Sequence, residues 1–396
     1  SPEIDDLPAV VRRIVVGEGE QFTRIQEPIN GMNSGTIYVK EGRYDRVTIN
    51  NKPINLQCIS QVDKCIIDAK GSESAVKISN VPNNQIEISG FTLENGNSNY
   101  GGGIYIRNAD VIIDSCLIQN NNADSDGGGI YITGSQSNCL ISNTEISNNT
   151  AQSGGGIYID GNEAANALDA TISTEMYNVN ILNNEAHVDN GFGGGIYTQY
   201  SENHITGCLI EENKSQYGGG IYFNMAQYAK VNLCSIKNNY AGGFGGAIGV
   251  INSTFSDSLI ITNSEILLNS ATNGGGLSII NDDEMISNNN IILFYNNLVV
   301  KNNYQSIGVY YGGGFYIENC DNITINYNTV IGNGNSGETT SGTSSYGGSI
   351  FLVDGELNIE NSIFWNNNAF LEEEWYLLNG QGSFKGEYTI INSNYN

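Results

Sequence analysis

The motif GGGIY, which recurs along most of the chain, constrains the fold more than any other feature of the sequence. It stands as GGGIYI at 101–106, 127–132 and 154–159, and variants of it continue toward the C-terminal part of the chain. A unit that returns at intervals in the twenties and thirties is typical of a solenoid, in which each unit packs only on its neighbours. The residue at the isoleucine position of the motif is Ile104, Ile130, Ile157, Ile196, Ile221, Ile248, Leu277, Phe315 and Ile350.

Within one unit the hydrophobic pattern is that of short strands. Ile104 and Ile106 alternate with Tyr105, which predicts a strand with the isoleucines inside and the tyrosine outside. Two further short strands are expected at 111–115 and 116–119, and no helical pattern separates them. Three short strands a turn predict an all-β parallel β-helix of about eleven coils, with strands of successive coils pairing about 4.8 Å apart.

The whole chain, 1–396, is expected to be a single β-helix domain. Residues 1–100 would hold the N-terminal cap and first coils, 101–370 the regular coils, and 371–396 a terminal coil. The stretch QFTRIQEPI at 21–29 predicts a short amphipathic helix that covers the open end of the core. The last residues show no obvious cap, so we expect the natural chain to continue, and end-to-end self-association is possible.

An asparagine column supports the solenoid. One asparagine follows each third strand at a constant offset, and such a ladder lets each side-chain amide bond the coils above and below. We therefore interpret the column as structural. Its expected members are Asn121, Asn149, Asn184, Asn213, Asn239, Asn269, Asn303, Asn333 and Asn367.

The composition excludes several kinds of partner. The chain has 42 acidic and 16 basic residues and a formal net charge of −26, which makes nucleic acid and an anionic membrane surface poor partners. The same acidity suits Ca²⁺, which prefers oxygen ligands. No apolar run approaches the roughly 20 residues of a membrane span, so no membrane insertion is expected.

The seven cysteines are an odd number for a disulfide framework. Cys58 and Cys65 are close enough in sequence to staple one loop. Cys116, Cys208 and Cys234 recur at one place in the repeat, and we interpret them as small buried fillers.

Several stretches carry a resemblance to a known superfamily. The segments FTRIQEPI, TIYVKEGRY, IIDAKG and ISGFTLENG resemble the start of secreted right-handed β-helix proteins of the pectate-lyase-like superfamily. The repeats NNTAQSGGGIYI and NNYAGGFGGAIG resemble those of polymorphic outer-membrane and related bacterial surface proteins. The resemblance implies an extracellular or cell-surface location. It does not fix an activity, because the superfamily includes lyases, hydrolases, epimerases, adhesins and structural spikes.

Two aromatic columns are the first candidates for a binding surface. One ring follows the aligned isoleucine in most coils and is expected to point outward, as a platform for the apolar faces of sugar rings. The alternative is that the rings stiffen the sheet or pack beneath a loop. The expected ligand-binding residues are Tyr105, Tyr131, Tyr158, Tyr197, Tyr222 and Tyr316. Gly249 and Ser278 interrupt the column. The interruption is either the floor of a cleft or sequence drift without a function. A second column precedes the glycines, at Tyr100, Phe192, Tyr217, Phe244, Tyr311 and Tyr346.

The candidate catalytic residues are few. Lyases of the resembling superfamily remove a proton next to a uronate carboxylate with a basic side chain, often with Ca²⁺. Lys214, His187 and Asp189 are the best local candidates, and Lys214 should lie one coil from Glu185. A simple Glu–Lys surface pair is the alternative.

Loop carboxylates are the candidates for a Ca²⁺ site or for the acid pair of a glycosidase. They are Asp124, Asp126, Asp160, Asp282 and Asp283. The alternative is that they are solvated turn charges.

Three functions are compatible with the sequence. The first is a secreted or cell-surface protein that binds polysaccharide or another surface through its aromatic columns. The second is a Ca²⁺-assisted polysaccharide lyase or a glycosidase, and the third is a structural stalk or filament segment.

Overall fold

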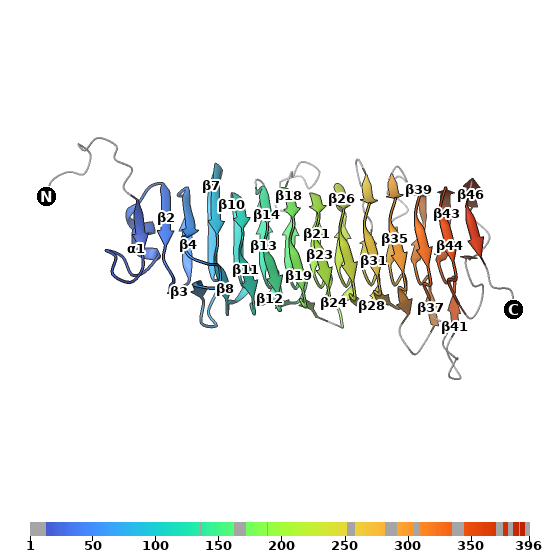
Figure 1. The fold of residues 1–396 in the computed structure, drawn as a ribbon, viewed down its shortest axis with the longest axis horizontal. Helices are drawn as coiled ribbons and strands as arrows, with labels where there is room; N and C mark the ends of the chain where they lie inside the picture. Colours follow the sequence, from blue (N-terminus) through green and yellow to red (C-terminus); the bar gives the residue numbers. More distant parts are fainter. Residues whose placement is uncertain are drawn as a thin grey trace.

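Strands of successive coils pair in parallel and in register along an elongated solenoid (Figure 1). The computed structural model describes residues 13–134, 137–161, 172–187, 189–251, 258–281, 291–304, 309–334, 344–369, 375–378, 383–387 and 389–392. Ile104 pairs with Ile130, and Ile130 pairs with Ile157, so the alignment on the GGGIY motif is the register of the sheet. The predicted parallel β-helix is therefore confirmed.

A regular coil contains four short strands, one more than the sequence predicts. The first and second strands belong to a 24-stranded sheet, the third to a 13-stranded sheet, and the fourth to an eight-stranded or a two-stranded sheet. The extra strand follows the asparagine ladder, where two to five residues, most of them polar, small or aromatic, show too little alternation to signal a strand.

The strands of the first column, which carry the GGGIY residues, are β10 (Ile104–Asp114), β13 (Ile130–Thr133), β17 (Ile157–Asp160), β21 (Ile196–Gln199), β25 (Ile221–Asn224), β29 (Ile248–Ile251), β33 (Leu277–Ile280), β38 (Phe315–Glu318), β42 (Ile350–Leu352) and β45 (Trp375–Leu377). Strand β10 continues into the second column, which contains β14 (Cys139–Ser142), β18 (Ile172–Tyr177), β22 (Ser201–Thr206), β26 (Tyr228–Asn232), β30 (Leu259–Thr262), β34 (Ile292–Tyr295), β39 (Cys320–Asn326), β43 (Gly355–Glu360) and β46 (Ser383–Glu387). The same sheet begins with β1 (Ile14–Val16), β2 (Gly35–Val39), β4 (Val47–Asn50), β5 (Ile54–Cys58) and β7 (Val76–Ser89).

The third column is formed by β3 (Gly42–Asp45), β6 (Cys65–Asp68), β8 (Thr92–Glu94), β11 (Leu117–Gln119), β15 (Glu145–Ser147), β19 (Asn180–Leu182), β23 (Leu209–Glu211), β27 (Ser235–Lys237), β31 (Glu265–Leu267), β35 (Leu298–Val300), β40 (Thr329–Ile331), β44 (Ile363–Trp365) and β47 (Ile390–Asn392). The fourth is formed by β9 (Asn97–Tyr100), β12 (Asn122–Asp126), β16 (Thr150–Ala151), β20 (Glu185–Ala186), β24 (Lys214–Tyr217), β28 (Tyr240–Phe244), β32 (Ser270–Ala271), β36 (Asn303–Tyr304), β37 (Val309–Tyr311) and β41 (Ser344–Tyr346).

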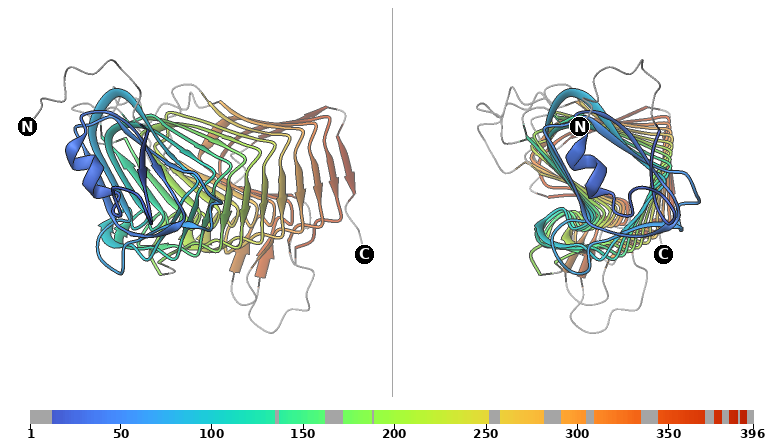
Figure 2. Two further views of the ribbon diagram at one scale, coloured as in Figure 1. Left: turned by 60° about the vertical axis from the view of Figure 1, so that its left-hand side comes forward. Right: turned by 90° about the vertical axis from the view of Figure 1, so that its left-hand side faces the viewer.

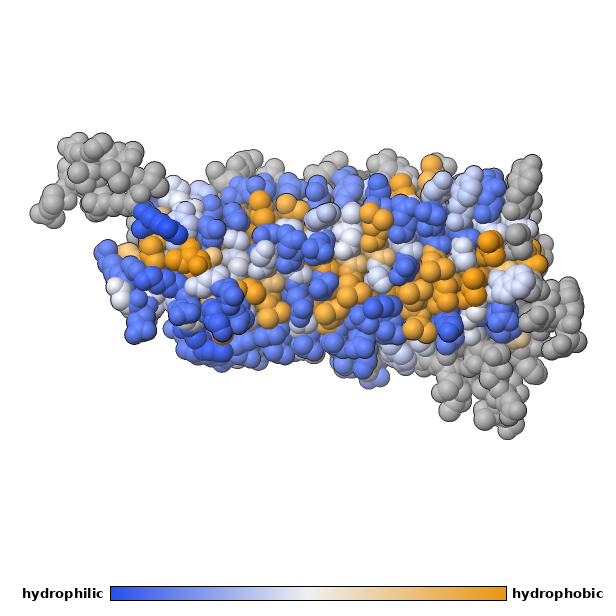
Figure 3. All heavy atoms as spheres, in the orientation of Figure 1, coloured by the Kyte–Doolittle hydropathy of each residue, from blue (hydrophilic) through white to orange (hydrophobic). Residues whose placement is uncertain are grey.

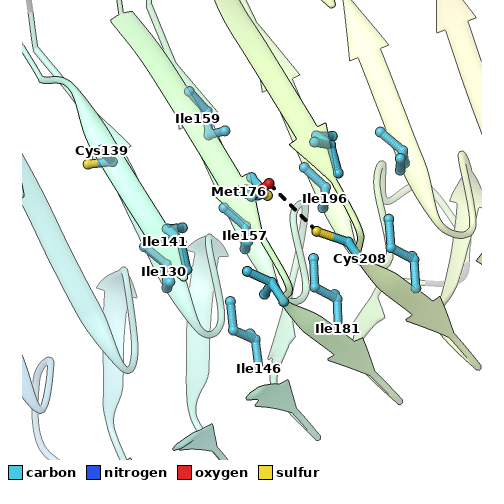
Figure 4. Close-up of a cluster of buried hydrophobic side chains, with 14 of the residues drawn as sticks. Ile130, Cys139, Ile141, Ile146, Ile157, Ile159, Met176, Ile181, Ile196 and Cys208 are labelled. Atoms are coloured by element: carbon cyan, nitrogen blue, oxygen red, sulfur yellow. Dashed lines mark hydrogen bonds between the residues drawn. The ribbon is translucent and has the colours of Figure 1, made fainter. Parts of the chain in front are cut away.

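The core is a stack of isoleucine rows inside the coil. Ile130, Ile157 and Ile196 lie directly above one another and are fully buried (Figure 4). The thiol of Cys208 donates to the carbonyl oxygen of Met176 at 3.8 Å in this core. Cys116, Cys208 and Cys234 are all buried free thiols, which confirms their interpretation as fillers. Cys58 and Cys65 form the expected disulfide.

The asparagine ladder is present and fully hydrogen-bonded. The side-chain amide of Asn149 donates to Oδ1 of Asn184 at 3.0 Å and to the carbonyl oxygen of Ile118 at 2.9 Å. One expected member is wrong, because Asn302 and not Asn303 accepts from Asn269 at 3.0 Å. The left-handed residue of this corner is the one before the ladder asparagine, such as Asn148 at φ 55°.

The glycines let neighbouring coils approach closely. Gly127 has φ +69°, in the left-handed region that favours glycine. A Cβ on Gly128 would fall against the carbonyl oxygens of Thr150 and Gly155 in the next coil. The triple glycine therefore supplies one sharp turn and a close backbone contact in each coil.

The predicted N-terminal helix caps the core. Helix α1 (Gln26–Gly31) lies across the open end of the first coils in the view down the solenoid (Figure 2, right). Ile25 and Ile29 are buried in the main core, while the helix turns Glu27 toward solvent.

The outer face of the 13-stranded sheet changes along the axis. One outward row of side chains is mostly polar in the N-terminal coils and apolar in the C-terminal coils. It runs through Gln119, Ser147, Leu182, Glu211, Lys237, Leu267, Val300, Ile331 and Trp365. Figure 3 shows apolar side chains gathering over the C-terminal half of the molecule, where β35 and β44 lie.

Candidate functional site

The first aromatic column is a continuous stack outside the main core. The ring centroids of Tyr131 and Tyr158 lie 5.4 Å apart, and those of Tyr158 and Tyr197 lie 4.4 Å apart. Tyr222 continues the stack, 5.7 Å from Tyr197. These rings form a hydrophobic cluster that is separate from the isoleucine core.

The expectation of an open tyrosine platform is wrong for most of this column. Tyr131, Tyr158, Tyr197, Tyr222 and Tyr316 are only 5–8% exposed, and Tyr105 is half-buried. The fourth strands curl beside the first strands, as the view down the axis shows (Figure 2, right). Rings of the second aromatic column then pack on the first. The ring centroid of Phe192 lies 5.2 Å from that of Tyr222, and the ring centroid of Tyr100 lies 5.0 Å from that of Tyr131.

The interruption at Gly249 and Ser278 opens a pocket. Tyr222, Gly249, Ser278 and Tyr316 succeed one another in register, so two coils lack a ring between Tyr222 and Tyr316. The cavity there measures about 300 Å³. We call it the aromatic pocket. Its lining residues are Phe192, Tyr217, Tyr222, Phe244, Gly249, Val250, Ile251, Ser278 and Ile280.

The second aromatic column is also interrupted at this level. Asn273 pairs with Phe244 in the preceding coil and with Tyr311 in the following coil, so it stands where a ring would otherwise continue the column. Phe244 spans the gap, with its ring 5.7 Å from Tyr217 and 6.0 Å from Tyr316. The aromatic pocket therefore lies between two aromatic clusters.

Two local features shape the pocket floor. A Cβ on Gly249 would lie 2.8 Å from Cδ2 of Tyr222, so the glycine allows the tyrosine ring to rest on the backbone. Ser278 is 1% exposed, and its hydroxyl has no hydrogen-bond partner within the described structure. The sequence marks the position of the pocket through the two missing rings, but it does not reveal the unpaired hydroxyl.

A carboxylate pair lies at the other end of the first column. Asp160 accepts from the Tyr131 hydroxyl at 3.4 Å and from the Gln199 amide at 2.8 Å. Burial, together with the negative charge of Asp160, raises the pKa of the half-buried Asp126 to about 6. Burial and Asp160 also raise the pKa of the Tyr131 hydroxyl.

Register could have revealed this pair. Asp126 stands in the second aromatic column, level with Tyr100 and Ser153 in the neighbouring coils. Asp160 directly follows the inward Ile159 on β17. Both positions therefore face the tyrosine stack, although one carboxylate precedes its GGGIY motif and the other follows it.

The metal prediction gains no support from the described residues. Asp124 is exposed, and no three His, Cys, Asp or Glu side chains gather as a metal site in the described part of the chain. Asp282 and Asp283 lie outside the described residues. The Ca²⁺ site stays a prediction.

The proposed catalytic residues lie on an exposed edge. Lys214 on β24 pairs in register with Glu185 on β20, as the repeat predicts. His187 and Asp189 are both exposed, and the backbone N–H of Asp189 donates to Nδ1 of His187 at 3.4 Å. None of the three is among the described residues that line the aromatic pocket.

Comparison with known proteins identifies the fold. Residues 74–236 match a family model described as a right handed beta helix region. The catalytic unit of an α-1,3-glucanase from Streptomyces thermodiastaticus has a TM-score of 0.51 and 12% identity, over 98% of this chain and 71% of that chain. The Agl-KA catalytic domain also has a TM-score of 0.51, with 14% identity over 96% of this chain and 69% of that chain.

No curated protein sequence matches this chain. The helix in the described part of the structure is too short to cross a membrane. The family match and the parallel, in-register coils together show that the chain is a right-handed parallel β-helix protein.

Proposed function

We propose that this chain is an extracytoplasmic β-helix protein that binds polysaccharide, and that a sugar ring binds in the aromatic pocket. The observation that carries the proposal is the interruption of both aromatic columns at neighbouring coils, which leaves a walled cavity of about 300 Å³. Concave, mostly apolar cavities with a few polar groups are the usual form of small-ligand sites. The fold itself does not choose a ligand.

The wall chemistry suits a carbohydrate. Phe192, Tyr217, Tyr222 and Phe244 supply ring faces and edges on the pocket wall. A pyranose ring has an apolar face of C–H groups and a rim of hydroxyls, so it can pack on aromatic faces while its rim finds polar partners. The buried tyrosine stack would then be a rigid support for the pocket wall. The sugar would contact the aromatic pocket and not an open tyrosine platform.

An oxidising location is consistent with the disulfide. Cys58 and Cys65 are joined near the N-terminal cap. Disulfides persist mainly in secreted, periplasmic and cell-surface proteins. This feature supports the extracytoplasmic part of the proposal together with the resemblance of the repeats to those of surface proteins.

A glycosidase is the second candidate, and one observation favours it. Asp126 and Asp160 form a carboxylate pair in which the pKa of Asp126 is raised to about 6 while Asp160 is held by hydrogen bonds. Glycoside hydrolysis uses two carboxyl groups, one of which holds its proton and acts as the acid. A lyase has less support, since Lys214 and His187 are exposed and neither is among the described residues that line the aromatic pocket.

A glycan array with parallel product detection tests these readings. Wild type is expected to bind a polysaccharide without releasing product, and Ser278→Tyr, which places a ring in the cavity, should lose that binding. Tyr177→Ala is the control, because Tyr177 is 59% exposed on β18 and lies outside the pocket. Release of reducing ends that Asp126→Asn abolishes would favour the glycosidase. Release of an unsaturated uronate product would favour the lyase.

A further inference from the structure

We infer that the aromatic pocket selects a single neutral pyranose ring and discriminates against uronates. The inference rests on the proposed function and names its ligand class. Three features of the pocket carry it: the charge of its surroundings, the spacing of its walls, and one buried hydroxyl that has no partner.

The charge around the pocket disfavours an anionic sugar. None of the nine described lining residues is a lysine, arginine or histidine. No arginine follows Arg107 in the sequence, and the chain has a net charge of −26. Of the few later lysines, Lys237 pairs with Glu211 at 3.3 Å. A uronate carboxylate would enter an apolar cavity without a cation to pair with, which carries a large desolvation penalty.

The size of the pocket suits one ring. A cavity of about 300 Å³ is at the small end of ligand sites. The missing rings at Gly249 and Ser278 leave three coil spacings, roughly 14 Å, between the backbone levels of Tyr222 and Tyr316. Phe244 already covers part of this space through its contact with Tyr316. One sugar ring would therefore take the place of the absent side chains in the stack.

The Ser278 hydroxyl explains why the ligand is a sugar and not a purely apolar ring. Ser278 lines the pocket, and its Oγ is buried and has no hydrogen-bond partner in the described structure. A buried hydroxyl without a partner is unfavourable, and native proteins leave few of them. A ligand hydroxyl would satisfy it by donating or accepting one hydrogen bond. An apolar ligand would leave it unpaired.

Calorimetric titration of matched probes tests the inference. The probes are neutral oligoglucosides of several linkages, oligogalacturonates and oligomannuronates of equal length, and toluene as an apolar ring. The proteins are wild type, Ser278→Ala and Ser278→Tyr. We expect a neutral oligoglucoside to bind wild type at least tenfold more tightly than any uronate probe. Ser278→Ala should weaken that binding about fivefold to tenfold, as expected for one hydrogen bond. Ser278→Tyr should abolish it.

Thermal unfolding separates a binding role from a structural one. Ser278→Ala removes an unpaired hydroxyl, so the free variant should be at least as stable as wild type while binding more weakly. Tighter binding of a uronate probe at the pocket would overturn the neutral-ring inference and leave the proposed function standing. Toluene binding equally to wild type and Ser278→Ala, without any saccharide binding, would overturn both. Saccharide binding that Ser278→Tyr leaves intact would also overturn both.

Discussion

At the scale of single residues, buried polar groups carry the strongest testable consequences. Asp126 is a carboxyl group whose pKa is raised to about 6 from an ordinary value of 3.8, by burial and then by Asp160. The folded state therefore holds the proton more tightly than the unfolded state. The stabilisation that comes from this proton on Asp126 is fully present below about pH 4 and is lost as the pH rises through about 6.

Asp126→Asn should remove this contribution. The free energy of unfolding of wild type should fall relative to that of the variant as the pH is raised from about 4 to about 6. Urea unfolding across this range measures the difference. Asp124→Asn, at an exposed position two residues earlier, is the control and should follow wild type. Parallel pH profiles for wild type and Asp126→Asn would contradict the assignment.

The corrected ladder position gives a second residue-scale prediction. Asn302 is buried and joins Asn269, Ile266 and Asn333, whereas the neighbouring Asn303 is exposed. Asn302→Ala should lower the free energy of unfolding by about 3 kcal/mol, because it leaves buried groups of two coils unpaired. Asn303→Ala should change it by less than about 0.5 kcal/mol. Chemical denaturation of the two variants shows which of the two asparagines belongs to the ladder. Equal losses in the free energy of unfolding would contradict the observed ladder.

At the scale of elements, the close approach of coils should limit what the glycine turns tolerate. Gly128→Ala would press a methyl group against backbone oxygens of the next coil and should lower the free energy of unfolding by about 1–3 kcal/mol. Gly31→Ala is a matched control, because a Cβ there would meet nothing within 4 Å. Thermal unfolding of both variants checks the prediction, which fails if the two midpoints agree.

The first three strands of each coil were largely predictable from sequence, whereas the fourth strand and the burial of the tyrosines beside it were not. The repeated isoleucine fixes the register, since a buried row must align from coil to coil, and Ile104, Ile130 and Ile157 do so. The fourth strand, such as Thr150–Ala151 in β16, is too short and polar to show a pattern. Without this strand, the alternation of residues predicts tyrosines that face solvent. The position of Gly249 and Ser278 was visible as a gap, but the walls of the pocket depend on that fourth strand.

At the scale of the whole molecule, a solenoid must cover its ends. Helix α1 places Ile25 and Ile29 over the first coils, which would otherwise present open strand edges and core side chains. Ile29→Asp should uncover this end and cause association. Size-exclusion chromatography with light scattering measures it, with the exposed Glu27→Ala as control. A variant that stays folded and keeps the wild-type mass would show that the cap does not prevent association.

A crystal structure with a bound neutral oligosaccharide would show whether the break in the aromatic columns is a sugar site. We expect one pyranose ring between Tyr222 and Phe244, with a sugar hydroxyl within hydrogen-bonding distance of Ser278 Oγ. An empty aromatic pocket, with the saccharide bound beside the exposed Lys214 and His187, would show that the pocket is not the sugar site.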